Sequence, residues 1–293
     1  MEIFGVPTAL LGSQLLVGLI NGSFYAVLSL GLAVIFGLLN IINFSHGAQY
    51  MMGAFVAWIA LTEFEVPYGW ALLLAPLVIG ASGVLIERLM LRRLYQLDHL
   101  YGLLLTFGLA LIFEGVFRDR YGVTGLSYEV PDLFKGGVHL GFMFLPYYRA
   151  WVVVAALSVC FATWFMIEKT RLGAYLRAGT ENPQIVQALG INVPLLVTLT
   201  YGYGVALAAF AGVLAAPVFQ VNPLMGSNLI IVVFAVVVIG GMGSILGSIV
   251  TGIGLGLIEG LTKVFYPEAS AVVVFVIMVI VLLVRPAGLF GKA

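Results

Sequence analysis

Of the 293 residues, 62% are hydrophobic and only 9% are charged, whereas ordinary soluble domains carry about 25% charged residues. There is too little polar material to cover the surface of a soluble protein of this length, which excludes an ordinary soluble domain. The net charge is zero, and a chain without a basic surface is not expected to bind nucleic acid.

Long apolar runs predict helices that cross a membrane. We expect them near 11–38, 42–62, 69–90, 100–117, 150–167, 194–218, 228–241, 246–265 and 271–285. The prediction is an all-α integral membrane protein, a polytopic bundle of about 8–9 transmembrane helices with some broken or short helices. Residues 1–293 are expected to form a single transmembrane domain.

Polar or glycine-rich stretches interrupt two of these runs. Asn21-Gly22-Ser23 interrupts the first run, so residues 9–20 form either part of one long helix or a separate interfacial or broken helix. The stretch 228–265 would be about 57 Å long as one helix, far longer than a roughly 30 Å hydrocarbon core. We expect it to break at Gly240-Gly241-Met242-Gly243 into two short crossings.

Basic residues indicate the orientation, because cytoplasmic loops are enriched in lysine and arginine. Such residues are dense in 88–99 and 168–193, which we place in the cytoplasm. The connection 118–149 has its basic residues diluted by acids, and we place it outside. An even number of crossings after residue 193 would put Arg285 and Lys292 inside and the N-terminus outside. The first residues have no basic region, so a signal peptide is not expected.

Small residues recur every four positions in two stretches, which places them on one face of a helix. Small side chains on such a face let helix backbones approach closely in a membrane. We expect helix packing at Gly240, Ser244, Ser248, Gly252, Gly256 and Gly260, and at Gly204, Ala208, Gly212 and Ala216.

Motifs for enzyme chemistry are missing. The closest approach to a phosphate-binding loop, at residues 288–293, has the wrong spacing, and Gly252-Ile-Gly254-Leu-Gly256 lies in an apolar helix rather than after a strand. The histidines are too far apart for a local metal cluster. We therefore expect no catalytic residues, no metal and no cofactor.

Two acid–base pairs four residues apart, Glu114 with Arg118 and Glu259 with Lys263, lie near predicted span ends. This order suits a helical ion pair. Anchoring of a helix end at the membrane interface is favoured over a role in transport.

The segment 40–50 is the most polar stretch within an apolar region. Its candidate translocation-pathway residues are Asn40, Asn43, Ser45, His46, Gln49 and Tyr50. Read as a helix, the segment gathers Asn40, Asn43, His46 and Tyr50 on one side. That side would line a polar pathway, or it would join helices by hydrogen bonds, or the segment would be a capped turn. His46 fits a hydrogen-bonded structural histidine better than a proton relay.

Residues 181–190 predict a short, self-contained helix in the second cytoplasmic loop. Asn182 suits an N-cap, Pro183 the first helical position and Gly190 a left-handed C-terminal stop. Ile185, Val186 and Leu189 form an apolar stripe. The helix is expected either to dock into a partner or to lie on its own bundle. Its residues include Glu181, Asn182, Pro183, Gln184, Ile185, Val186, Leu189 and Gly190.

Over nearly its whole length, the chain resembles the LivH-type permeases of branched-chain amino acid ABC importers. The segments that carry the resemblance are GLLNIINFSHGAQYMMGAF (37–55), RLGAYLRAGTENPQIVQALGINV (171–193), VNP (221–223), VVVIGGMGSILGSIVTGIGLGLIE (236–259) and VRPAGLFG (284–291). Their combination and order are specific for this group of permeases. Related permeases for urea, short amides or other amino acids have similar segments.

The resemblance implies a multi-pass subunit of the bacterial inner membrane that imports leucine, isoleucine or valine. Its partners would be a second homologous permease, two cytoplasmic ABC ATPases and an external substrate-binding protein. Residues 181–190 would be the coupling helix that inserts into an ATPase, and 40–49 would lie beside the pathway. Glu181 and Gly190 are nine residues apart, which departs from the usual coupling motif, and Ala48 replaces an acid found in some members.

The main alternative is a self-sufficient secondary transporter. Such proteins usually place charged residues near the middle of the membrane, and the predicted spans carry almost none there. A scaffold that transports nothing is a more distant alternative.

Overall fold

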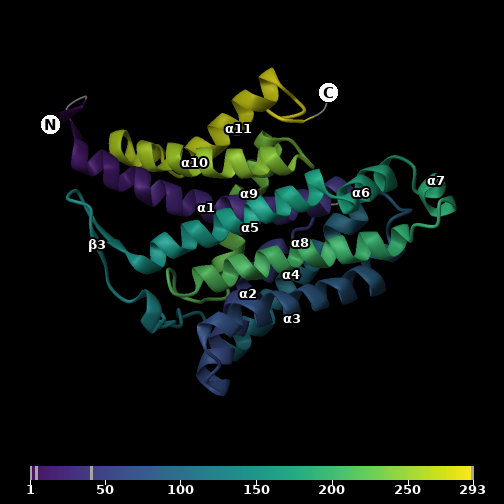
Figure 1. Cartoon of the computed structure of the whole chain (residues 1–293), viewed down its shortest axis with the longest axis horizontal. Helices are drawn as coiled ribbons and strands as arrows, with labels where there is room; N and C mark the ends of the chain where they lie inside the picture. Colours follow the sequence, from purple (N-terminus) through teal and green to yellow (C-terminus); the bar gives the residue numbers. More distant parts are fainter. Residues whose placement is uncertain (1, 4–5, 40–41, 292–293) are drawn as a thin grey trace. The chain divides into compact units, whose positions relative to one another are not determined.

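The computed structural model describes residues 2–3, 6–39 and 42–291, and most of them are helical (Figure 1). Asn40 and Lys292, both named above, lie outside the described residues. The long helices are α1 (Thr8–Leu39), α2 (His46–Phe64), α3 (Tyr68–Leu89), α4 (His99–Tyr121), α5 (Tyr147–Lys169), α8 (Val193–Ala215), α9 (Met225–Gly240), α10 (Ile245–Phe265) and α11 (Val273–Val284).

The remaining elements are short. They are the helices α6 (Arg171–Glu181) and α7 (Pro183–Ala188), the 3-10 helices η1 (Leu91–Arg93), η2 (Asp132–Phe134) and η3 (Pro267–Ala269), and the strands β1 (Glu2–Ile3), β2 (Val6–Pro7), β3 (Gly137–His139) and β4 (Phe144–Pro146). The strands form two antiparallel hairpins, β1 with β2 and β3 with β4.

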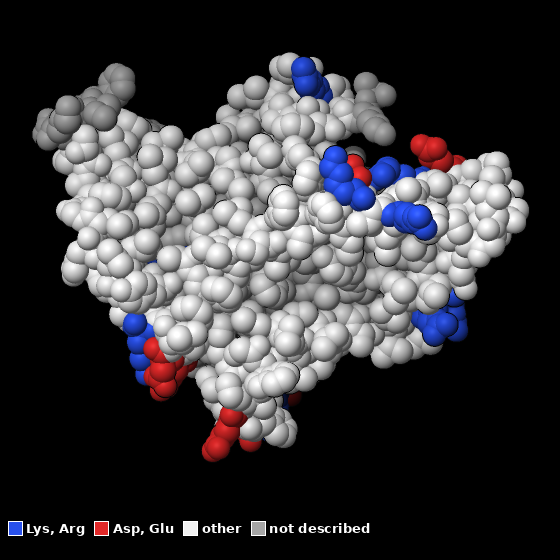
Figure 2. Space-filling model, viewed as in Figure 1, with Lys and Arg blue, Asp and Glu red and all other residues white. Residues whose placement is uncertain are grey.

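Helix length and composition confirm a polytopic membrane protein. Among the described residues, six helices are long and apolar enough to cross a membrane: Thr8–Gly37, Tyr68–Arg93, His99–Tyr121, Tyr147–Lys169, Val193–Ala215 and Ile245–Phe265. The apolar helices α9 and α11 are shorter, at 16 and 12 residues. Figure 2 shows charged side chains in only a few patches of the visible face, which is otherwise uncharged.

The first helix is continuous, so residues 9–20 are not a separate helix. α1 has 32 residues, which corresponds to about 48 Å of helix. Its polar interruption is absorbed within the helix, because the Ser23 hydroxyl donates to the Leu19 carbonyl oxygen at 2.8 Å. Gly22 lies against the backbone of α10 at Ile253, where a side chain would collide. The polar and small residues at this point therefore serve packing and do not end the helix.

The predicted break between 228 and 265 is confirmed. α9 ends at Gly240 and α10 begins at Ile245, with Gly241 and Gly243 at positive φ angles of 100° and 82°. The C-terminal segment packs onto this turn, where Leu289 N donates to Ile239 O at 2.8 Å. Two of the segments that carry the family resemblance thus contact each other.

The chain forms two compact units. The first unit comprises Met1–Ser29, Glu129–Cys160 and Val232–Ala293, and the second comprises Leu30–Tyr128 and Phe161–Ile231. In the second unit α8 is central, since it packs against both α2 and α3, and these helices lie side by side (Figure 1). α6 and α7 contact α8 as well.

Close backbone contact joins α8 to its neighbours in the second unit. A Cβ placed on Gly204 would meet the Gly31 carbonyl oxygen of α1 at 2.8 Å, and one on Gly212 would meet the Ala54 nitrogen of α2 at 2.8 Å. A Cβ on Gly83 of α3 would lie 2.9 Å from the Val205 Cβ. Each of these positions therefore requires glycine for the observed helix spacing.

In the first unit, α10 packs against α1 along part of the predicted small-residue stripe. A Cβ on Gly252 would meet the Ala26 nitrogen at 2.7 Å, and one on Gly256 would meet the Gly18 carbonyl oxygen at 2.5 Å. Gly260 faces the carbonyl of Gln14, and Ser248 O accepts from the Ser29 hydroxyl at 3.2 Å.

The first two residues of that stripe have other positions. Gly240 ends α9 and lies against Gly247. Ser244 is the N-cap of α10, and its hydroxyl oxygen accepts from Gly247 N at 3.1 Å. The four-residue spacing thus continues through the turn between α9 and α10, but only the residues within α10, from Ser248 to Gly260, face α1.

We predict that Gly256→Leu lowers the apparent melting temperature of the purified protein in detergent. The leucine side chain would force α10 away from α1, and overpacking of this kind typically costs about 1–3 kcal/mol. Gly252→Leu should have the same effect. Gly254→Leu is the matched control, because nothing lies within 4 Å of a Cβ at that position. Equal melting temperatures for Gly256→Leu and Gly254→Leu would refute the close packing of α1 on α10.

Candidate functional site

The helix expected at 181–190 is present with the expected start and stop. α7 spans Pro183–Ala188, and the Asn182 side chain caps it by accepting from Ile185 N at 3.1 Å. Gly190 has a φ of +86°, the left-handed conformation that favours glycine. The local sequence therefore determines both ends of this helix.

The apolar stripe of this helix, Ile185, Val186 and Leu189, is partly exposed and partly buried. Ile185 and Leu189 are 59% and 74% exposed, whereas Val186 is only 5% exposed. Val186 packs against its own unit and is thus not free to serve as a docking residue. Of the three apolar positions, Ile185 and Leu189 remain available to a partner.

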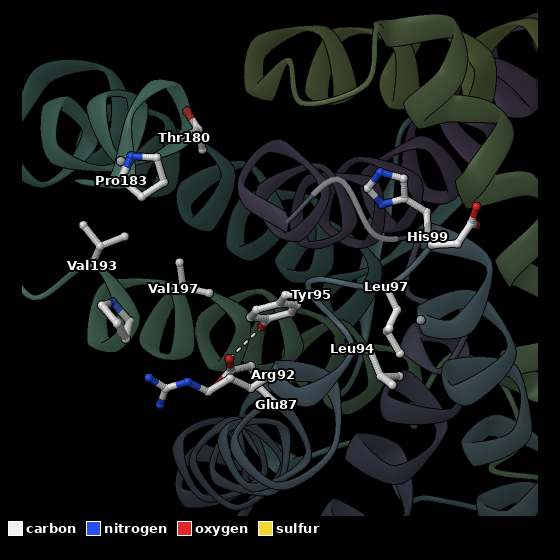
Figure 3. Close-up of a pocket in the computed structure, with 14 residues that line it drawn as sticks. Glu87, Arg92, Leu94, Tyr95, Leu97, His99, Thr180, Pro183, Val193 and Val197 are labelled. Atoms are coloured by element: carbon white, nitrogen blue, oxygen red, sulfur yellow. Dashed lines mark hydrogen bonds between the residues drawn. The ribbon is translucent and has the colours of Figure 1, made fainter. Parts of the chain in front are cut away.

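A cavity of about 300 Å³ lies beside this helix in the second unit. Its walls come from α6 and α7, from the start of α8, and from the connection between α3 and α4. Figure 3 shows Thr180 and Pro183 on one side and Leu97 and His99 on the other. The loops 88–99 and 168–193, which we expect in the cytoplasm because they are rich in basic residues, thus lie together at one end of this unit.

A buried acid, Glu87, forms part of the cavity wall. Glu87 is 1% exposed and lies near the end of α3. The Tyr95 hydroxyl donates to its Oε1 at 2.7 Å, and the Thr198 hydroxyl of α8 donates to its Oε2 at 2.6 Å. The first of these bonds is drawn in Figure 3. Glu87 thus ties α3, the following loop and α8 together beside the α6–α7 segment.

The environment of Tyr95 keeps its phenol protonated. Burial raises its pKa well above the ordinary value, and the hydrogen bond and negative charge of Glu87 raise the pKa further. The hydroxyl therefore remains a donor to Glu87 at physiological pH. The hydrogen bond connects the α3–α4 loop to the end of α3.

The sequence analysis missed Glu87 because it stands directly before Arg88 at the start of a charged loop. In the sequence it adjoins the basic loop 88–99 at the end of the apolar run 69–90. The helical spacing distinguishes Glu87 from the loop charges. Gly80, Gly83 and Glu87 are three and four residues apart on α3, so they share one face, and all three are buried. An acid on the buried face of a membrane helix needs polar partners.

The polar segment 42–50 begins as a turn, which is one of the alternatives left open by the sequence, and only its second half is helical. Residues 42–45 are not helical, and α2 begins at His46. Asn43 Oδ1 accepts from Ser45 N at 3.1 Å and from the Ser45 hydroxyl at 2.6 Å. This local side-chain bonding offers the backbone an alternative to helix, so Asn43 is not on one helical face with His46 and Tyr50.

The pathway candidates that the structure describes lie inside the second unit. Asn43, Ser45, His46, Gln49 and Tyr50 are all buried. Gln49 joins the cluster by donating to Ser45 Oγ at 3.1 Å and accepting from Asn43 Nδ2 at 3.1 Å. Tyr201 of α8 lies beside Gln49 and Ser45. The turn is also tied to α4, since Phe44 N donates to Thr106 Oγ1 at 3.2 Å.

α2 and the start of α9 meet where two glycines touch. A Cβ on Gly47 would lie 3.0 Å from the Gly226 carbonyl carbon and 3.1 Å from the Ile230 Cβ. Cavities flank this contact. One, of about 80 Å³, includes Phe44, Ala48, Glu114, Pro223 and Ser227, and the other, of about 390 Å³, includes Tyr50, Gln220, Asn222 and Asn228.

The two acid–base pairs have different positions. Lys263 Nζ lies 2.5 Å from Glu259 Oε1, and the Tyr25 hydroxyl donates to Glu259 Oε2 at 2.8 Å, all within the first unit. Glu114 lines the small cavity beside Gly47, and no ion pair with Arg118 occurs among the described residues.

Known proteins resemble the chain over almost its full length. Residues 14–282 match the family "Branched-chain amino acid transport system / permease component". The high-affinity branched-chain amino acid transport system permease protein LivH of Escherichia coli K12 is 30% identical, covering 95% of each chain. The corresponding protein BraD of Pseudomonas aeruginosa is 32% identical with the same coverage.

A more distant relative is the probable LivH of Methanocaldococcus jannaschii, which is 27% identical over 93% of this chain and 90% of its own length. No solved structure gives a significant match. The family match includes all or most of every long helix, and the LivH and BraD proteins are matched over 95% of their length. The chain therefore belongs to the family of branched-chain amino acid transport system permease components.

Proposed function

We propose that this chain is the membrane-spanning permease subunit of an ATP-driven importer that carries leucine, isoleucine or valine across the bacterial inner membrane. Identity of about 30% across 95% of the chain to permease proteins named for branched-chain amino acid transport carries this proposal. The multi-pass helical fold supports it, since it provides several helices able to cross the membrane.

The energy for transport would come from two partner ATPases in the cytoplasm, with a second permease subunit and an external substrate-binding protein completing the assembly. The sequence contains no phosphate-binding loop. The exposed side chains of Ile185 and Leu189 support docking of α7 to an ATPase. The α7 helix would transmit the ATPase motion to α8 and to the α3–α4 loop, which Glu87 holds together.

Some of the polar residues near α2 would support the fold, and others would line the translocation pathway. Asn43, Ser45 and Gln49 satisfy one another, which supports a role in holding the non-helical turn at the start of α2. Tyr50 reaches the larger cavity beside Asn222 and Asn228, which supports a place on the pathway. His46 is fully buried and packs against Gly31, which favours a structural role.

The proposed function is tested by reconstitution into liposomes. We predict that the chain alone shows neither ATPase activity nor concentrative uptake of leucine. Addition of the partner permease, the ATPases and loaded binding protein should produce ATP-dependent uptake. Concentrative uptake by the lone subunit, driven by an ion gradient, would contradict the proposal and favour a secondary transporter.

We predict that Leu189→Asp weakens the binding of the ATPases to the membrane subunits. Loss of a central apolar contact at an interface costs about 2 kcal/mol or more, which corresponds to about a 30-fold loss of affinity. Co-purification measures the bound ATPase, and vesicle uptake should stop.

Gln187→Asp is the matched control for this substitution. It adds the same charge to the same helix at an exposed polar residue on the other side of α7. Normal ATPase recovery with Leu189→Asp would reject α7 as the main docking element.

The orientation is tested with a cysteine at Gln184 in a Cys160→Ala background. Gln184 is exposed beside the N-terminus of α7, so the cysteine should react with an impermeant thiol reagent only from the cytoplasmic side. Val123→Cys, in the connection assigned to the outside, should react only from the external side, since Val123 is exposed as well. The reverse labelling pattern would overturn both the orientation and the coupling role of α7.

A further inference from the structure

The larger cavity beside the α2–α9 contact has a polar but uncharged lining. It measures about 390 Å³, and its residues are Tyr50, Phe219, Gln220, Asn222, Met225, Asn228 and Leu229. None of these seven side chains carries a charge, three are carboxamides and the others are aromatic or aliphatic. A volume of this size lies near the lower end for small-molecule sites, which start at about 300 Å³.

We propose that this cavity is a subsite for the transported amino acid, where carboxamides bind the ammonium and carboxylate groups and apolar residues contact the side chain. The proposal rests on the proposed import function. It adds a place and a recognition chemistry to that function, and it concerns the permease itself, independently of the external binding protein.

Carboxamides suit a zwitterion because each one can both donate and accept. The amide nitrogen donates two hydrogen bonds to a carboxylate, and the amide oxygen accepts from an ammonium group. A lining without charges has no preference for a net cation or anion. Both charges of the ligand still need hydrogen-bond partners on leaving water. The lining therefore favours a neutral zwitterion with an apolar side chain over a simple ion.

Two of the carboxamides are available for a ligand. Within the described residues, neither Gln220 nor Asn228 makes a side-chain hydrogen bond, and both are exposed. Asn222 differs, because its Oδ1 accepts from Leu224 N at 3.0 Å and its Nδ2 donates to Gln220 O at 3.1 Å. Asn222 thus shapes the turn before α9, while Gln220 and Asn228 offer free donors and acceptors.

Exposed carboxamides on a membrane protein require an explanation. Asn228 lies in the first turn of the very apolar helix α9. Unsatisfied polar groups in contact with lipid are costly, and they occur where the protein lines a water-filled space. Gln220 is held in place against Gly125, where a Cβ would collide with the glutamine side chain. Both amides line the cavity, and the Gln220 side chain is held there by its contact with Gly125.

The cavity lies at the end of the second unit opposite α7. Val221, between Gln220 and Asn222, exchanges backbone hydrogen bonds with Leu126 of the 118–149 connection at 2.8 and 2.9 Å. Trp58, near the end of α2, donates to Ser127 O at 3.2 Å. With 118–149 outside, as the basic residues indicate, the cavity adjoins the side from which substrate arrives.

The test uses a cysteine at Leu229, a lining residue without a carboxamide, in a Cys160→Ala background of the assembled permease–ATPase complex in vesicles. A hydrophilic thiol reagent should modify this cysteine, and leucine should slow the modification by about tenfold at ten times its dissociation constant. The probes 3-methylbutylamine and 4-methylpentanoate each lack one charged group of leucine and should protect much less.

Two controls assign the protection to the carboxamides. A cysteine at Ser227, which lines the smaller cavity on the other side of Gly47, should react without protection by leucine. Asn228→Leu added to the Leu229→Cys protein should remove the protection, whereas Ser227→Leu should leave it. An unreactive cysteine at 229, or equal protection by leucine and both analogues, would overturn the subsite.

Leucine uptake by the complete wild-type importer is measured in the same vesicles. Uptake without protection at residue 229 would leave the import function standing and reject the subsite. Protection without uptake would leave the subsite standing and reject the import function. The two proposals therefore fail separately.

Discussion

Contact between helix backbones is the constraint on which the rest of this structure depends. Lipid chains are as apolar as the helix surfaces, so no hydrophobic force drives the helices together inside a membrane. Close approach at Gly204 and Gly212 lets α8 touch α1 and α2, and Gly83 does the same for α3. These contacts position Gln49 on α2, Glu87 on α3 and Thr198 on α8, because the three helices carry these polar groups.

The contacts between helix backbones also determine which polar groups are buried and which are exposed. The Asn43–Ser45–Gln49 cluster sits where α2 is pressed against its neighbours, and its members satisfy one another. Glu87 is buried in the same manner, with two hydroxyl donors. Gln220 and Asn228 are exposed instead. In a membrane protein, burial with internal partners indicates support of the fold, whereas exposure within an apolar segment indicates contact with water or with a solute.

Features encoded by neighbouring residues were predictable from the sequence. The ends of α7 follow from Asn182, Pro183 and Gly190, and the glycine turn after Gly240 breaks the long apolar run where expected. The positions of most long helices also follow from the apolar runs, to within a few residues.

Features that depend on tertiary packing were not predictable in the same way. For the segment 40–50 the sequence leaves both a helix and a capped turn open. The described part is a turn up to Ser45, held by the contact of Phe44 N with Thr106 of α4 as well as by the local Asn43–Ser45 bond. Val186 looked equivalent to Ile185 and Leu189, and only its contact with its own unit distinguishes it. Glu87 adjoins the loop charges in the sequence, and its burial depends on the Tyr95 and Thr198 hydroxyls that donate to it.

The self-contained character of α7 has a consequence for how such transporters diversify. Its cap, its stop and its single buried anchor lie within nine residues, and Ile185 and Leu189 remain mostly exposed. Under the proposed docking role of α7, substitutions at Ile185 and Leu189 would alter the fit to a given ATPase while the membrane helices keep their packing. If α7 is the docking element, as proposed, a duplicated importer would acquire a different ATPase by changes in this segment alone, because Ile185 and Leu189 lie outside the packed helices.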